Sequence, residues 1–266
     1  MKAILKILCI ALLFVVLTAL TQIGGLVLLL SFWLAKRFKK SFRLKKTFFF
    51  LSGYFLATFL VIPIVAPLFG REKIIQNERI KPTTYWTVIL NRNYVRPKLN
   101  KLLATVLKDI KNTKIRINYL DANFPFINKF PLLPHLSHND GKKIDISLIY
   151  ETKSGEIVTK QRSRTGYGVF VSPTKKEYNQ IKHCLKKGYF QYDYPKYLSF
   201  GKINSNLVFS KKGTKQLINA ILAQKELGKL FIEPHLKKRM NLSNPKIRYH
   251  GCHAVRHDDH IHIQLK

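Results

Sequence analysis

The sequence predicts an α+β fold, with a mainly antiparallel sheet and flanking helices, preceded by two transmembrane helices. Two long apolar segments fill most of the first 70 residues. The later part alternates between strand-like and helix-like apolar patterns, which is typical of this fold class. We therefore divide the 266 residues into a membrane anchor at 1–70, a connector at 71–95 and a domain at 96–266. The domain is long enough to form one hydrophobic core.

The anchor contains two apolar runs, at residues 7–35 and 47–70. Each run exceeds the roughly 20 residues that a helix needs to cross a bilayer. A cleaved signal peptide is the alternative for the first run, but the apolar core of a signal peptide is only about 7–15 residues long. We therefore expect both runs to be retained as helices in the lipid bilayer.

The segment between the two runs is strongly basic, with seven Lys or Arg in residues 36–46. Short basic loops remain on the cytoplasmic side of a membrane. The N-terminus offers only Lys2 and Lys6, so the basic loop should set the orientation. This pattern predicts a multi-pass protein of the cell (inner) membrane, whose chain from Arg71 onward faces the periplasm or the cell exterior.

The chain carries 47 Lys or Arg against 14 Asp or Glu, with a formal net charge of +33. Nine of the basic residues and none of the acidic ones lie in the anchor, so most of the excess charge belongs to the remainder. Such a surface favours a polyanion, which could be nucleic acid, anionic lipid or an acidic cell-wall polymer. The outward location and the lack of any nucleic-acid-binding signature argue against nucleic acid. We expect no nucleic-acid partner.

Periodicity predicts the remaining elements in order. A short strand is expected at 85–90 in the connector, and a helix begins at Pro97, after which apolar residues recur at helical spacing as far as Ile110. Residues 123–134, with three prolines and three Phe, should form an ordered loop. Strands are expected at 115–119, 144–150, 156–160, 229–232, 247–250 and 260–265, and further helices at 173–187 and 214–226.

Seven of the nine histidines fall in two short windows, one beginning at His135 and the other ending at His262. Successive side chains of a strand point to opposite faces of its sheet. This alternation places His260 and His262 on one face of the strand at 260–265, and Asp145 on the polar face of the strand at 144–150. Asp145 and His262 could therefore meet on the same face.

Imidazoles and carboxylates are normal zinc ligands, and three protein ligands leave a fourth position for water, as in catalytic sites. Surface histidines or an incidental metal-sequestering patch are the alternatives. The fixed offsets within the two windows favour a defined metal site.

These windows resemble the zinc D,D-peptidases of bacterial cell walls, especially the penicillin-insensitive murein endopeptidases. That superfamily includes the D-Ala-D-Ala metallopeptidases, lysostaphin-type enzymes and the Hedgehog domain. The family pattern is His-x-x-Gly-x-x-x-Asp followed by His-x-His; His138, Gly141 and Asp145 match the first part, and His260 and His262 the second. The resemblance implies that His138, Asp145 and His262 bind Zn²⁺, that His260 stands beside the metal water, and that the fold is Hedgehog/D,D-peptidase-like.

Two further histidines of the endopeptidase branch are reproduced by His135 and His257. In contrast, Asp259 matches an acidic residue of the carboxypeptidase branch, and Lys143 stands where the family commonly has a small or apolar residue. The chain thus combines features of both branches, which leaves the reaction subtype open.

The resemblance implies hydrolysis of peptide cross-links in peptidoglycan, and such a reaction needs a base that passes a proton from water to the leaving amine. His260 is the first candidate because it lies on the metal face of its strand. Asp259 is the second candidate, because a carboxylate near zinc stays ionised and could serve as the base. It ranks below His260 because a regular strand would turn its side chain to the other face. We expect Asp258 and His257 to orient the ligand imidazoles.

Arg162 and Arg164 could clamp a substrate carboxylate, although their stretch is also compatible with an ordinary basic loop. Cys9 lies in the first apolar run, so at most Cys184 and Cys252 could pair, and Cys252 is expected to be structural. The alternative functions are a D,D-carboxypeptidase, a non-catalytic peptidoglycan-binding module that retains the fold, and a zinc amidase acting on the same polymer.

Overall fold

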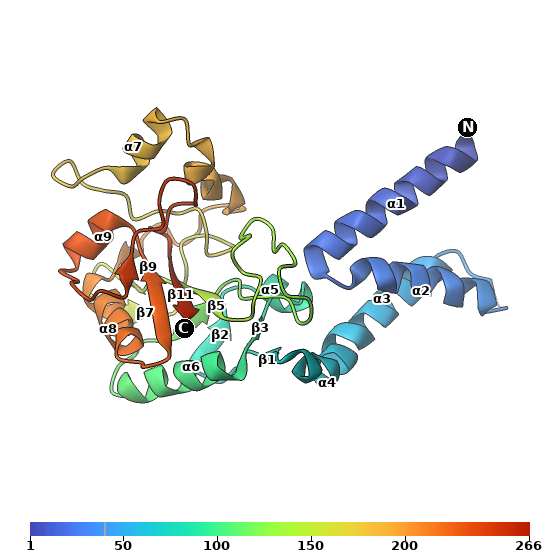
Figure 1. Cartoon of the computed structure of the whole chain (residues 1–266), viewed down its shortest axis with the longest axis horizontal. Helices are drawn as coiled ribbons and strands as arrows, with labels where there is room; N and C mark the ends of the chain where they lie inside the picture. The colour runs from blue at the N-terminus through green and yellow to red at the C-terminus, as the bar shows by residue number, and fades with distance from the viewer. Residues whose placement is uncertain (40) are drawn as a thin grey trace. The chain divides into compact units, whose positions relative to one another are not determined.

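The computed structural model describes residues 1–39 and 41–266 (Figure 1). This part of the chain has an α+β fold, as predicted, and divides into two compact units. The first unit comprises Met1–Ile74, Trp86–Pro97 and Asn123–Gly141, and the second comprises Ile75–Tyr85, Lys98–Ala122 and Lys142–Lys266.

The first unit begins with apolar helices. They are α1 (Lys2–Thr21), α2 (Gly24–Arg37), α3 (Lys45–Leu56), η1 (Ala57–Val61), α4 (Ile62–Val65) and η2 (Ala66–Phe69). By length and composition, two helices could cross a membrane: Lys2–Thr21 and the continuous stretch Lys45–Phe69. The first of these is shorter than the expected run at 7–35, because the chain breaks between α1 and α2. At 14 residues, α2 is shorter than the roughly 20 residues of a spanning helix.

The break between α1 and α2 has a local cause. Gln22 adopts a positive φ of 68°, which ends α1. The Thr21 hydroxyl donates to the Leu17 carbonyl at 2.7 Å and accepts from the Gly24 N–H at 2.8 Å, so one side chain serves both helix ends. The Gln22 side chain also accepts from the N–H of Phe126 at 2.9 Å. Hydrogen bonds of polar side chains with the backbone therefore interrupt an otherwise apolar sequence.

The rest of the first unit consists of short elements and a long loop. Strand β1 (Glu72–Lys73) pairs antiparallel with β3 (Tyr94–Val95), and a single helical turn, α5 (Trp86–Ile89), lies between them in sequence. The strand expected at 85–90 was therefore wrong: the Leu90 N–H donates to the Trp86 carbonyl at 2.9 Å, which closes a helical turn. Residues 123–134 form a loop as predicted, and the buried Arg71 side chain donates to its Phe124 carbonyl.

The second unit contains a six-stranded sheet in the order β10-β9-β11-β5-β4-β2. Its strands are β2 (Ile80–Pro82), β4 (Ile117–Tyr119), β5 (Lys143–Ser147), β9 (Leu227–Phe231), β10 (Ile247–Arg248) and β11 (His260–Leu265). The three central pairings are antiparallel, whereas β10 runs parallel to β9 and β2 runs parallel to β4. The sheet is therefore mixed, and the expectation of a mainly antiparallel sheet was wrong. Both parallel pairs join strands that are separated by a helix in sequence, as parallel pairing requires.

The second unit also contains a smaller sheet and several helices. A second sheet has the order β7-β6-β8, formed by β6 (Tyr150–Glu151), β7 (Ile157–Val158) and β8 (Val208–Phe209). The helices are α6 (Pro97–Asp109), α7 (Gln180–Lys186), η3 (Phe190–Leu198), α8 (Lys211–Leu222) and α9 (Pro234–Arg239). Helix α6 begins at Pro97 as predicted, and its buried residues include Leu99, Leu102, Leu103 and Val106.

Helix α7 is much shorter than the helix expected at 173–187. It begins after Asn179, whose side chain accepts from the Lys182 N–H at 2.8 Å and so caps the helix. It ends before Gly188, which has a φ of 83°. The residues before the cap form an irregular segment instead.

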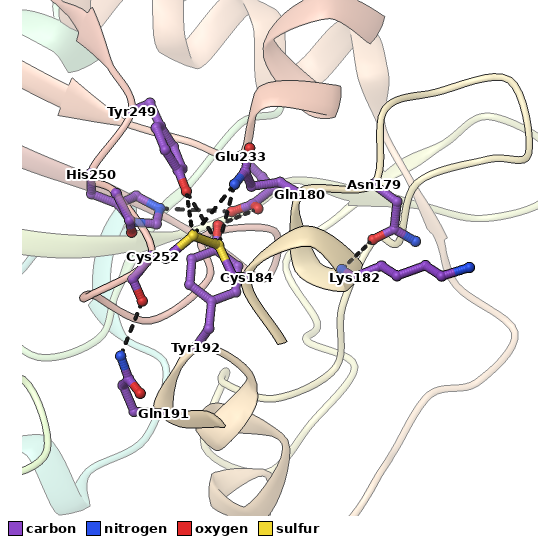
Figure 2. The surroundings of a disulfide bond; sticks show 11 residues. Asn179, Gln180, Lys182, Cys184, Gln191, Tyr192, Glu233, Tyr249, His250 and Cys252 are labelled. Atoms are coloured by element: carbon purple, nitrogen blue, oxygen red, sulfur yellow. Dashed lines mark hydrogen bonds and ion pairs between the residues drawn. A yellow bond between two sulfur atoms is a disulfide. The ribbon is translucent and has the colours of Figure 1, made fainter. Parts of the chain in front are cut away.

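A disulfide joins α7 to the segment that leads into β11 (Figure 2). It links Cys184 to Cys252 across 68 residues, which is the pairing that the sequence allowed. Cys184 packs with Ile181 and Tyr192 in a small buried cluster. This cluster fixes α7 and η3 to the segment that precedes the histidine-rich strand.

Candidate metal centre

The three expected ligands form a buried group that could hold a metal ion. One ligand atom each from His138, Asp145 and His262 lie within 4.8 Å of one another. Asp145 is the middle residue of β5, and His262 stands directly opposite it in β11. The apolar neighbours Ile144 and Ile263, also paired in this register, are completely buried. Strand alternation therefore brings together the two residues that the sequence assigned to one face.

The Asp145 carboxylate is held from two sides. Its Oδ1 lies 2.8 Å from Nδ1 of His262, and its Oδ2 accepts a hydrogen bond from the Tyr167 hydroxyl at 2.8 Å. That hydroxyl also accepts from the Asp121 N–H at 3.1 Å. Burial and the neighbouring Asp145 charge raise the pKa of Tyr167 well above its ordinary value, so the phenol stays protonated and donates.

Sequence reasoning missed Tyr167, although a signal for it exists. The residue lies between Gly166 and Gly168, which have φ values of 90° and 77°. A Cβ at Gly166 would lie 2.2 Å from Leu120 Cδ2, and one at Gly168 would lie 2.3 Å from the Pro195 carbonyl oxygen. Two glycines that tolerate both positive φ and close approach allow this tight segment to place a tyrosine between them.

Asp259 and His260 form a buried pair beside Asp145. Oδ1 of Asp259 lies 2.5 Å from Nδ1 of His260, and Oδ2 of Asp259 accepts from the Gly168 N–H at 2.6 Å. Nε2 of His260 lies 3.7 Å from Oδ2 of Asp145. Asp259 precedes β11, so the alternation of side chains along the strand does not fix the direction of its side chain. Its carboxylate can therefore contact the imidazole of His260, which lies near Asp145.

The charge of His260 is set by its carboxylate neighbours. Burial lowers the pKa of this imidazole, but the Asp145 and Asp259 charges outweigh burial and raise the pKa to about 9. The imidazolium form is therefore favoured at neutral pH in the absence of another cation. A metal ion bound to Asp145 would reduce this effect by adding positive charge nearby.

His257, which was expected to orient a ligand imidazole, and His135, which matches the endopeptidase branch, are buried in different surroundings. The His257 ring lies 4.7 Å from the His260 ring, and its backbone N–H donates to Glu233 Oε2 at 3.0 Å. Burial and the adjacent imidazoles depress the pKa of His257 well below its ordinary value, so the ring is neutral. The His135 ring lies 5.7 Å from the ring of His138.

Asp258 lies in an ion pair. Its carboxylate accepts from Nε and Nη2 of Arg256 at 2.7 and 2.6 Å, and Nη1 of the same guanidinium binds Asp193 of η3 at 2.6 Å. Burial raises the pKa of Asp258 to about 7 despite the pairing. His235 Nε2 is 3.8 Å from the carboxylate. Asp258 therefore connects the strand that carries the metal group to η3.

Arg162 and Arg164 lie on the segment that leads to Tyr167. Arg162 is half-buried, and its carbonyl accepts from the Ile203 N–H at 2.9 Å. Arg164 is exposed, and its N–H donates to the Gly201 carbonyl at 3.2 Å. Both residues thus belong to a segment that contacts the chain after η3.

Comparison with models of protein families and with characterised proteins gave no match to this sequence. The function of the centre is therefore inferred from its own side chains.

Proposed function

We propose that this chain is a membrane-anchored zinc peptidase that hydrolyses peptide cross-links in peptidoglycan, as a murein D,D-endopeptidase does. The observation that carries the proposal is the buried group of His138, Asp145 and His262, with the Asp259–His260 pair beside it. A metal-ligand set and an oriented imidazole are the two parts that metal-assisted hydrolysis requires.

The donor set fits zinc. Two imidazoles and one carboxylate match a zinc site of catalytic type, and their burial limits competition from bulk water. Tyr167 would hold Asp145 in place by donating to the oxygen that His262 does not contact. When bound, zinc polarises a carbonyl oxygen and makes water acidic enough to react near neutral pH.

His260 is the proposed proton carrier. Its Nδ1 faces Asp259, which orients the ring and favours a proton on that nitrogen. Its Nε2 faces the metal group and is the atom that would accept a proton from water and deliver it to the leaving amine. Asp259 is then a positioning residue, held in turn by the Gly168 N–H.

Peptidoglycan as the substrate is supported by sequence and charge. The spacing of the ligands resembles that of murein D,D-peptidases, and 38 basic residues against 14 acidic ones after residue 70 favour an anionic polymer. Penicillin should not inhibit the reaction, because it traps a nucleophilic serine and hydrolysis by a metal centre uses none.

Three features support placing the second unit outside the cytoplasm of a cell whose inner membrane holds the anchor. Two helices could span the membrane, the loop at 36–46 is basic, and Cys184 and Cys252 form a disulfide. Disulfides persist in oxidising compartments such as the periplasm and the cell exterior. The oxidation state of the two cysteines in intact cells tests this location.

Metal analysis of the full chain, purified in detergent, tests the ligand assignment. Substitution by Ala at His138, Asp145 or His262 should each lower zinc occupancy. His260→Ala should keep zinc but lose turnover, because we assign this residue to proton transfer. His253→Ala is the matched control. His253 lies in the same window but is exposed, so its substitution should leave zinc occupancy and turnover unchanged. Full zinc occupancy in the His262 variant would contradict the assignment.

Digestion of purified peptidoglycan identifies the bond. Cross-linked muropeptide dimers should fall as monomers rise, and chelation should stop the change. If dimers persist while terminal D-Ala disappears, the D,D-carboxypeptidase alternative replaces the endopeptidase. If zinc is bound and no muropeptide changes, the chain is better described as a binding module that retains the metal.

A further inference from the structure

The segment 173–207, between β7 and β8, combines aromatic and basic residues. It contains seven Tyr or Phe and seven Lys, against one Glu and one Asp. It carries α7 and η3 and is fixed by the Cys184–Cys252 disulfide.

Two of its tyrosine rings lie side by side, and a third exposed ring follows them in sequence. Helix η3 is a 3-10 helix, in which residues three apart are eclipsed. Tyr194 and Tyr197 have this spacing and are 49% and 67% exposed. Phe200, two residues beyond the end of the helix, is 74% exposed. The rings of the two tyrosines have centroids 5.8 Å apart. We call these three residues the aromatic ridge.

The fold does not need these rings as core. The same segment already buries Tyr192 completely, together with Ile181 and Cys184. Phe200 also has a φ of 44°, a conformation that bulky residues rarely adopt. A large aromatic residue is thus kept exposed at a position where Asn or Gly would fit the backbone better, which points to a role for the ring.

The ridge adjoins the segment that supports the metal group. The Thr165 hydroxyl donates to the Leu198 carbonyl at 2.7 Å, and Gly168 approaches Pro195 too closely to admit a Cβ. On its other side, Gly168 donates to Asp259, and the neighbouring Tyr167 donates to Asp145. One short segment therefore separates the ridge from the candidate centre.

We propose that the aromatic ridge binds the glycan strand of the polymer whose peptides reach the metal centre. This proposal rests on the function proposed above and adds a second binding surface to it. The C–H faces of sugar rings stack on aromatic rings, and the phenol groups of Tyr194 and Tyr197 can also exchange hydrogen bonds with sugar hydroxyls.

Charge and composition favour a glycan over a lipid surface. Lys196 lies 5.0 Å from the Tyr197 ring centroid and is paired with Asp193 at 3.0 Å, so charged groups border the ridge. Helices that lie in a lipid surface present a broad apolar face instead. Two of the three ridge residues have polar tips, and η3 is only nine residues long.

The test is binding of the full chain in nanodiscs to insoluble peptidoglycan, measured by co-sedimentation with a chelator present so that no hydrolysis occurs. Tyr194→Ala/Tyr197→Ala should weaken binding about tenfold or more, since two stacked rings are lost. Phe200→Asn should weaken it as well, without lowering stability, because Asn adopts positive φ more easily. Tyr85→Ala is the matched control: Tyr85 is also 67% exposed but lies off the ridge.

Two outcomes would overturn the proposal. The first is that the ridge variants bind peptidoglycan as tightly as the wild type, whatever their zinc content and turnover. The other is insertion into lipid: a tryptophan introduced by Tyr197→Trp, with Trp33→Phe and Trp86→Phe in the background, would then be quenched by brominated lipid in the nanodisc. If the ridge substitutions weaken binding but the wild-type chain, purified without chelator, contains no zinc, the peptidase is refuted and the ridge stands, so the two failures are distinguishable.

Discussion

Removal of the Cys184–Cys252 disulfide should destabilise the second unit strongly. The bond joins two segments 68 residues apart, and the residues between them include α8, β9 and α9. It lies five residues before His257, so it also restrains the segment that enters β11. Reduction, or the substitutions Cys184→Ala and Cys252→Ala, tests this role.

The magnitude follows from the length of the closed loop. For 68 residues, the chain-entropy model gives about 4 kcal/mol at 25 °C, within the roughly 2–5 kcal/mol usually lost when a native disulfide is removed. For a protein of this size, such a loss corresponds to a fall in melting temperature on the order of 10 °C. Most of this effect arises in the unfolded state. Without the cross-link the unfolded chain has more conformations, so its entropy rises and its free energy falls.

The assay compares thermal unfolding of the oxidised, reduced and doubly substituted chains in the same detergent. A thiol count provides the control, since Cys9 is the free cysteine of the oxidised chain. Equal melting temperatures would refute the reasoning about loop closure. If all three thiols are reactive in chains captured in intact cells, the proposed extracytoplasmic location is refuted.

Two further perturbations address the centre and the surface. Tyr167→Phe should lower zinc affinity about 10- to 100-fold while keeping the ring packed, because Asp145 loses its phenol donor; an unchanged zinc titration would contradict this role. Hydrogen bonding to Arg239 lowers the pKa of Glu177 to about 2 from 4.5, so the pair stabilises the fold above pH 4.5 and this contribution disappears as pH falls towards 2. For a pair near the surface, the loss should be about 1 kcal/mol. Glu177→Gln should remove that part of the acid dependence, and an acid profile identical to that of the wild type would show that the pair contributes nothing.

Strand alternation made the central part of the site predictable. The expected strand at 260–265 coincides with β11, and its register places His262 opposite Asp145. This worked because the isoleucines of both strands pack on one face, so that a shift of one residue would turn them to the polar face and place Asp145 and His262 in the apolar core. The ligands could then be predicted from the spacing of residues within each window, without knowing how the long intervening chain folds.

Features that depend on contacts distant in sequence were not predictable. Parallel pairing of β2 with β4 and of β9 with β10 depends on how the intervening helices return, which local periodicity does not encode. The turn at Trp86–Ile89 has β-branched residues that suggest a strand, but its hydrogen bonds close a helix. Tyr167 was missed because its role comes from its hydroxyl meeting Asp145 and the Asp121 N–H.

The position of β11 affects how the protein is made. This strand is the latest of the sheet in sequence, yet it lies between β9 and β5, with partners on both sides. Until residues 260–265 have been synthesised, β9 and β5 each have an unpaired edge on the side that β11 will occupy. Such edges can pair with strands of other chains. The arrival of β11 also supplies His260 and His262, so completion of the sheet and assembly of the centre are one event. A chain that ends before residue 260 would therefore lack two histidines of the candidate centre as well as the strand between β5 and β9.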